Sequence, residues 1–132
     1  MRATARRIAI KSFSQRIEVR RHELLADEPI ELGGDDDGPT PQELLAASLA
    51  SCAAITIQMY ARRKGWLLGP AEVQCEYKTA KRGERTVFKL VLRLPGALTE
   101  EQVQCLVAIA AKCPVQRAIA CEVSFEERVE RV

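Results

Sequence analysis

The stretch TPQELLAASLASCAAITIQMYARRKG, residues 40–65, decides the fold of this chain. Thr40 can cap a helix that begins at Pro41, a first position where the missing N–H of proline costs no hydrogen bond. Glu43 follows Thr40 by three residues and completes a capping box. Gly65 stands where glycine commonly ends a helix. These signals predict one helix of roughly 24 residues, about 36 Å long at 1.5 Å per residue.

The predicted helix, residues 41–64, is apolar almost all round in its first half, so we expect it to be buried on several sides. Its small side chains, alanine and serine between residues 46 and 54, would let another helix approach closely. In a chain of 132 residues, such a central helix indicates that a second copy of the chain covers part of it. The longest apolar-rich run, residues 44–57, has 14 residues, fewer than the ~18–20 that a membrane-spanning helix needs.

The residues just before the helix, 33–39, read GGDDDGP and are expected to form a loop. Glycines ahead of a helix can cradle a phosphate group, but three aspartates here would repel an anion. We therefore expect no phosphate-binding loop at this position.

Strands are predicted on both sides of the helix from alternating apolar residues and turn signals. This order is typical of an α+β fold, with mainly antiparallel sheets around a long central helix, in a single domain that spans residues 1–132. The expected strands are 4–12, 16–25 and 29–32 before the helix, then 71–79, 86–94 and 122–128 after it.

Two further helices are expected between the last two strands. Thr99 and Gln102 form another capping box, which predicts a helix that runs to about Lys112. Pro114 disfavours the helical conformation at Cys113, so we expect a kink there and a short third helix after it.

Composition excludes several classes of function. A formal net charge of +2 is far from the dense positive patch that binds nucleic acid through its phosphates. His22 is the single histidine and no CxxC pattern occurs, so three or four convergent metal ligands are not expected. A serine triad would lack a base other than His22, and no GxSxG elbow is present. We expect no metal, no bound cofactor, no nucleic acid partner and no membrane partner.

The cysteines indicate the compartment. Five cysteines without paired spacings do not form a disulfide scaffold. The first ten residues contain no apolar run of a signal peptide, so we expect a reducing, cytoplasmic location. In that setting a cysteine pair would be catalytic rather than structural.

Cys52 and Cys113 are the candidate pair. Cys113 is expected at the N-terminus of the short helix, where unpaired N–H groups would lower the pKa of its thiol. Cys52 lies near the middle of the long helix, so its thiolate would need a nearby cation. The early arginines Arg16, Arg20 and Arg21 are the expected donors. Spacing alone leaves open that both cysteines are inert core residues. Packing roles are expected for the remaining three, Cys75, Cys105 and Cys121.

Three segments carry a resemblance to a known family. GGDDDGPTPQELLAASLASCAAITIQMYARRKGW (33–66) resembles the central segment of the OsmC/Ohr proteins, and CPVQRAI (113–119) resembles a segment near their end. HELLADEP (22–29) fits the OsmC-like branch related to the domain fused behind some α/β-hydrolases. The similarity covers residues 16–125, and both cysteines fall in the contexts that the family has.

The resemblance implies an intertwined homodimer with two sites at the subunit interface. Family enzymes reduce organic hydroperoxides, and some reduce hydrogen peroxide, with two thiols. By position, Cys52 would be the peroxidatic cysteine and Cys113 the resolving one. An external dithiol, such as a lipoylated protein, would restore the pair.

This sequence also departs from the pattern of the hydroperoxide-reducing branches. Those branches have a glutamate directly after the proline that opens the helix, and it holds the catalytic arginine. Here Gln42 has that position and Glu43 follows it, turned by about 100° around the helix. Arg20 is the arginine assigned to the site by its location. The alternative function is therefore a binding or accessory domain without efficient turnover, which holds a small hydrophobic ligand at the dimer interface. A thiol-dependent hydrolase is a more distant alternative.

Overall fold

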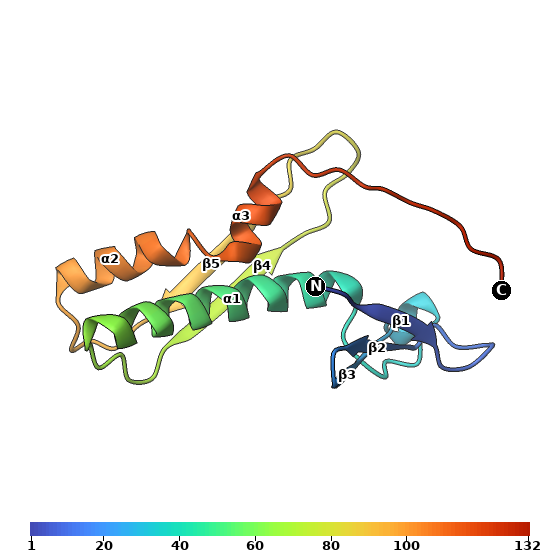
Figure 1. Cartoon of the computed structure of the whole chain (residues 1–132), viewed down its shortest axis with the longest axis horizontal. Helices are drawn as coiled ribbons and strands as arrows, with labels where there is room; N and C mark the ends of the chain where they lie inside the picture. The colour runs from blue at the N-terminus through green and yellow to red at the C-terminus, as the bar shows by residue number, and fades with distance from the viewer. The chain divides into compact units, whose positions relative to one another are not determined.

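The computed structural model describes residues 1–132. The chain forms two compact units, residues 1–47 and 48–132. The fold is α+β with antiparallel sheets, as predicted (Figure 1). Its elements are β1 (Thr4–Arg7), β2 (Gln15–Val19), β3 (His22–Ala26), η1 (Ile30–Leu32), α1 (Pro41–Lys64), β4 (Glu72–Tyr77), β5 (Phe88–Arg93), α2 (Glu100–Ala110) and α3 (Pro114–Ala120).

The first unit contains a three-stranded antiparallel sheet in the order β1-β2-β3. The strand predicted over 16–25 is in fact two strands joined by a tight turn, because Val19 pairs with His22. Arg20 makes this turn with a left-handed backbone, at φ 56°. Such turns usually carry glycine or asparagine, so Arg20 and Arg21 carry no turn signal at this point. The strand predicted over 4–12 ends earlier, at Arg7.

The strand predicted over 29–32 was wrong, since these residues form the 3-10 helix η1. Pro29 precedes η1 and has no N–H to donate to a sheet. Gly33 ends it at φ 88°, where its N–H donates to the Ile30 carbonyl at 2.9 Å. A positive φ of this kind favours glycine.

The predicted loop over 33–39 is confirmed, and the buried carboxylate of Asp27 holds it in place. Asp27 Oδ2 accepts hydrogen bonds from the backbone N–H groups of Asp35 and Asp37, both at 3.1 Å, and from Ser14 Oγ at 2.9 Å. Gly34 has no room for a side chain, because a Cβ there would lie 1.8 Å from the Glu28 carbonyl oxygen.

Helix α1 begins and ends where the sequence predicts. The Thr40 hydroxyl accepts the Glu43 N–H at 3.1 Å, and the Glu43 carboxylate accepts the Thr40 N–H at 2.8 Å, which completes the capping box. Gly65 follows the helix with φ 71°. Both helices after the hairpin are also confirmed, with a Thr99–Gln102 capping box on α2 and the kink at Cys113.

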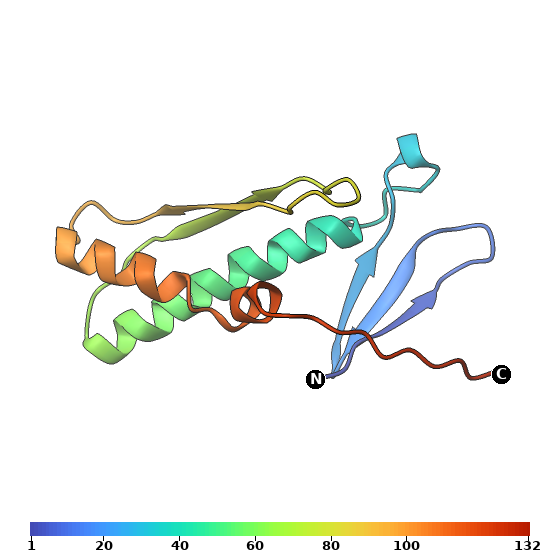
Figure 2. The same cartoon turned by 90° about the horizontal axis from the view of Figure 1, so that it is seen from above.

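The core of the second unit lies where α1 and α2 pack on one side of the β4–β5 hairpin (Figure 2). Along β5, Leu90 and Leu92 are half-buried while Lys89 and Val91 are exposed, so alternation places one face inward. The buried cluster consists of Ala53, Ile57, Ala61, Leu68, Leu106 and Ala110.

Within one chain, α1 is not buried on several sides as predicted. Its buried residues are Leu49, Ala53, Ile57 and Ala61, a single stripe four residues apart. Ile55 and other apolar side chains outside this stripe are exposed. An 18-residue window of this helix has a mean hydropathy of 1.6, so the expectation that its apolar run is too short to span a membrane was wrong by length and composition; the core helix of a globular protein passes the same test.

The strand predicted over 122–128 was wrong for the single chain. These residues extend beyond α3 without regular structure (Figure 1). Phe125 and Val129 are 84% and 90% exposed, so the apolar alternation that predicted the strand has no surface to cover within the chain.

Candidate thiol site

Helices α1 and α3 bring Cys52 and Cys113 together within the second unit. Cys52 lies on α1 and is half-buried. Cys113 lies at the start of α3 and is fully buried. Both are free thiols, and they are neighbours: Cys52 is among the groups that shift the pKa of Cys113. The predicted pair are therefore neighbours in the folded chain.

Cys113 is the N-cap residue of α3, as predicted. Its Sγ accepts the backbone N–H of Gln116 at 3.4 Å. The predicted lowering of its pKa, however, was wrong. Burial raises the pKa of the Cys113 thiol, and the neighbouring Cys52 raises it further, while N–H groups of Gln116 and Val115 act in the opposite direction. Removal from water disfavours the thiolate more than the short helix favours it.

The other three predicted site residues lie in the first unit. Arg20 is exposed in the turn between β2 and β3 rather than on a strand. Gln42 and Glu43 are exposed in the first turn of α1, ten and nine residues before Cys52. The Glu43 carboxylate already accepts the Thr40 N–H, so it serves the helix cap.

The remaining cysteines lie in separate places. Cys75 is half-buried in β4, where burial raises the pKa of its thiol, with a further contribution from Glu76. Cys105 on α2 donates to the Tyr60 hydroxyl at 3.1 Å. Cys121 is exposed just after α3.

A pocket of about 510 Å³ lies beside the thiol pair, between α1 and the junction of α2 and α3. Thr56 lines it and donates its hydroxyl to the Cys52 carbonyl at 2.7 Å, while the residues on either side of Cys113 also line it. This size suits a small organic ligand. The lining residues are Thr56, Met59, Arg62, Arg63, Ile109, Lys112 and Pro114.

Sequence reasoning missed this pocket, because only its α1 side has a pattern along one segment. Thr56, Met59 and Arg63 follow Cys52 by four, seven and eleven residues, which places all four on one face of a helix. The other side of the pocket comes from Ile109, Lys112 and Pro114, which are distant in sequence.

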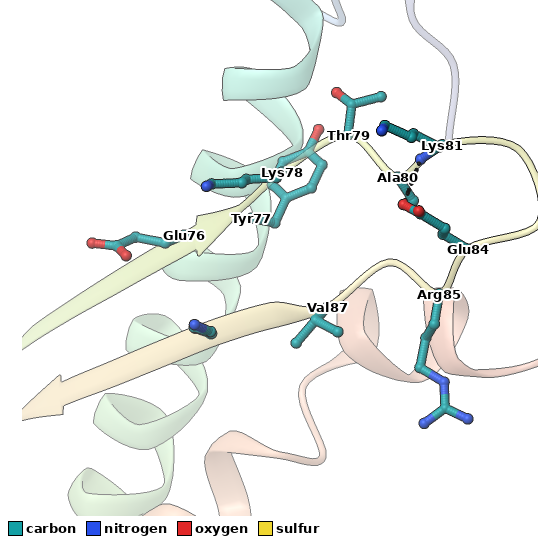
Figure 3. Close-up of a pocket in the computed structure, with 10 residues that line it drawn as sticks. Glu76, Tyr77, Lys78, Thr79, Ala80, Lys81, Glu84, Arg85 and Val87 are labelled. Atoms are coloured by element: carbon teal, nitrogen blue, oxygen red, sulfur yellow. Dashed lines mark hydrogen bonds between the residues drawn. The ribbon is translucent and has the colours of Figure 1, made fainter.

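A second pocket, of about 540 Å³, lies along the β4–β5 hairpin and contains no cysteine (Figure 3). It mixes basic and acidic side chains, and the charged ends of Lys78 and Arg85 point in different directions. Lys81 donates its backbone N–H to the Glu84 carboxylate at 3.1 Å, which fixes the turn. These groups do not converge on one ligand position.

Asp27, Asp35 and Asp37 form the one cluster of possible metal ligands. Burial of Asp27 opposes its ionisation, but hydrogen bonds from three backbone N–H groups and the Ser14 hydroxyl lower its pKa below the usual value. These donors already bind both oxygens of Asp27, so its carboxylate holds the loop over residues 33–39 in place.

Comparison with known proteins agrees with this fold. Residues 34–128 match the family model of the OsmC-like proteins. An OsmC-like protein from Mycoplasma pneumoniae superposes with a TM-score of 0.75 at 17% identity, over 90% of this chain and 86% of that one. The OsmC organic hydroperoxide resistance protein from Legionella pneumophila gives a TM-score of 0.62 at 27% identity, over 89% and 86%.

The organic hydroperoxide resistance protein OhrB of Bacillus subtilis is also similar, with a TM-score of 0.60 at 20% identity over 89% of this chain and 87% of that one. No match was found among the curated proteins. The family model covers well over half of the 132 residues and includes both cysteines of the candidate site. The chain belongs to the OsmC-like protein family.

Proposed function

We propose that this protein is a thiol peroxidase that reduces organic hydroperoxides through Cys52 and Cys113. The observation that carries the proposal is the neighbouring position of these two free thiols, next to a pocket that Thr56 and Pro114 help to line. The hydroperoxide resistance proteins among the structural neighbours support the same class of substrate.

The half-buried Cys52 is the proposed attacking residue, because it is reachable while Cys113 is fully buried. The Cys52 thiolate attacks the terminal peroxide oxygen, the O–O bond breaks, and the alkoxide leaves as an alcohol after it takes up a proton. Cys52 is then a sulfenic acid. Cys113 attacks its sulfur, forms the disulfide and releases water. An external dithiol, such as a lipoylated protein, returns two electrons and restores both thiols.

The proposed cation for the Cys52 thiolate is Arg20, held by Gln42. Gln42 is exposed at the start of α1 and has an amide oxygen that can accept from a guanidinium. Glu43 is bound to the helix cap, so we assign the positioning role to Gln42. This arrangement lacks the second charge of an arginine–glutamate pair, which predicts a slower enzyme than one with glutamate at position 42.

We further propose that the protein acts as a homodimer in the cytoplasm. The exposed face of α1, with Ile55 at 55% exposure, and the extended segment around Phe125 offer apolar surface for a second copy. Light scattering on purified protein tests the dimer, and Ile55→Lys should shift it toward monomer.

The experiment that tests the function is peroxide consumption by the reduced protein with dihydrolipoamide as the reductant. We expect multiple turnovers with cumene hydroperoxide. If the thiols stay reduced in the presence of peroxide, the peroxidase proposal fails, and the alternative of a binding or accessory domain with a small hydrophobic ligand is favoured.

A further inference from the structure

The two legs of the β4–β5 hairpin separate before the chain turns. Strand pairing ends at Tyr77 and Phe88, whose ring centroids lie 4.6 Å apart. Residues 78–80 and 85–87 continue the two legs and form no backbone hydrogen bonds with each other. The pocket of about 540 Å³ is lined by both legs, which Figure 3 shows lying apart.

The backbone of both legs is therefore available to a ligand. Each residue other than proline carries one N–H donor and one C=O acceptor, and residues 78–80 and 85–87 contain no proline. An extended peptide offers a matching row of donors and acceptors and can add to an unpaired strand edge through main-chain hydrogen bonds. Phosphate and nucleic acid lack this row of groups, so the free backbone favours a peptide ligand.

Positive charge is in excess in the same pocket. Its charged lining side chains are four basic ones, Lys78, Lys81, Arg85 and Lys89, and two acidic ones, Glu76 and Glu84. Glu76 lies directly opposite Lys89 in the strand register, and the Glu84 carboxylate already accepts the Lys81 N–H at 3.1 Å. The three ion pairs of the chain all involve other basic side chains. A pocket with this excess of charge attracts an acidic ligand.

The positions of the charges indicate an extended ligand rather than a compact one. The charged ends of Lys78 and Arg85 point in different directions, so one small anion cannot meet both (Figure 3). Ala80 and the 54% exposed Val87 also line the pocket and offer apolar contacts. Side chains along an extended peptide alternate between opposite sides. A segment that alternates acidic and apolar residues therefore matches both the charges and the apolar surface.

We propose that the pocket between the hairpin legs is a docking site for an extended acidic peptide segment of a partner protein. The peptide backbone pairs with residues 78–80 and 85–87, and its carboxylates meet Lys78 and Arg85. No cysteine lines this pocket, so docking there does not use the thiol pair. The inference is independent of the proposed peroxidase function.

The test is a nuclear magnetic resonance titration of the reduced, full-length protein, labelled with ¹⁵N, with the acetylated peptide Glu-Val-Glu-Val-Glu. We expect the largest amide shifts at residues 78–80 and 85–87. The peptide should bind about five- to tenfold more tightly than Gln-Val-Gln-Val-Gln, because several surface charge pairs are lost in the latter. N-methylation of every residue removes the N–H donors and should weaken binding about five- to tenfold.

Arg85→Gln should weaken the acidic peptide about two- to fivefold and leave the glutamine peptide unchanged. Arg82→Gln is the matched control, because Arg82 is an exposed residue of the same hairpin tip but does not line the pocket. Its effect should be smaller than that of Arg85→Gln.

No binding, equal affinity for the glutamate and glutamine peptides, or unchanged affinity after N-methylation would overturn the docking site. Equal effects of Arg82→Gln and Arg85→Gln would also overturn it, since they would show diffuse attraction to the hairpin tip. A peptide with the sequence of residues 122–128 that binds where Glu-Val-Glu-Val-Glu does not would overturn the partner protein and assign the pocket to the C-terminal segment of this chain.

Discussion

The Cys113 thiol is fully buried beside the half-buried thiol of Cys52, and it caps α3 through a 3.4 Å hydrogen bond from the Gln116 N–H. This difference in burial is the basis of the two proposed roles. In the proposed function, the more accessible thiol of Cys52 meets the peroxide and the buried thiol of Cys113 resolves it.

The buried position of Cys113 predicts a pH-dependent resolving step. Because burial raises the pKa of the Cys113 thiol, less thiolate is present at neutral pH than for an exposed cysteine, and the thiolate fraction grows as the pH rises. We expect disulfide formation after one equivalent of peroxide to accelerate between about pH 7 and pH 9. Rapid-quench trapping of free thiols measures this rate. A rate that is flat over that range would mean that Cys113 does not limit the step.

Serine variants distinguish the roles of the two cysteines. Cys52→Ser should reduce peroxide consumption to the background rate, because the attacking sulfur is gone. Cys113→Ser should consume one equivalent and stop, with Cys52 left as a sulfenic or more oxidised acid. Stoichiometry of peroxide loss and intact-protein mass measure both outcomes. Cys121→Ser is the control with full turnover, and sustained turnover by either of the first two variants would refute the assigned roles.

Gly34 sets the geometry of the loop before α1. A methyl group at Gly34 would lie 1.8 Å from the Glu28 carbonyl oxygen, so the backbone must shift. We expect Gly34→Ala to lower the free energy of unfolding by about 1–3 kcal/mol, the usual effect of overpacking. Gly96→Ala is the control, since nothing lies within 4 Å of its Cβ position. Urea denaturation compares them, and equal midpoints would contradict the described loop.

Leu106 anchors α2 to the core and is fully buried. Leu106→Ala leaves a cavity among α1 and the hairpin, and we expect a loss of about 2–5 kcal/mol in the free energy of unfolding. Val107→Ala, at a position that is 50% exposed, should change it by less than about 0.5 kcal/mol. Thermal and chemical unfolding measure the difference, and similar losses would place Leu106 outside the core.

Local signals predicted the helices well because each helix end carries its own hydrogen-bonding chemistry. Thr40 with Glu43, Thr99 with Gln102, and Cys113 before Pro114 are such signals. The β2–β3 turn was missed because Arg20 adopts a left-handed backbone, and arginine is not a residue type that indicates this conformation.

The cysteine pair was also predictable, but its electrostatics were not. The position of Cys113 at a helix start is a local property, whereas the burial that raises its pKa depends on the packing of α1 against α3. The pocket beside the thiol pair likewise needs two segments, the last turns of α1 and the residues around Lys112, that are distant in sequence. No pattern along one segment encodes that meeting.

Disulfide mapping by mass spectrometry, after one equivalent of cumene hydroperoxide is added to the fully reduced protein, tests the central claim most directly. The account predicts rapid formation of a Cys52–Cys113 link, with Cys75, Cys105 and Cys121 still reduced. Thiols at Cys52 and Cys113 that remain reduced and open to alkylation would contradict it.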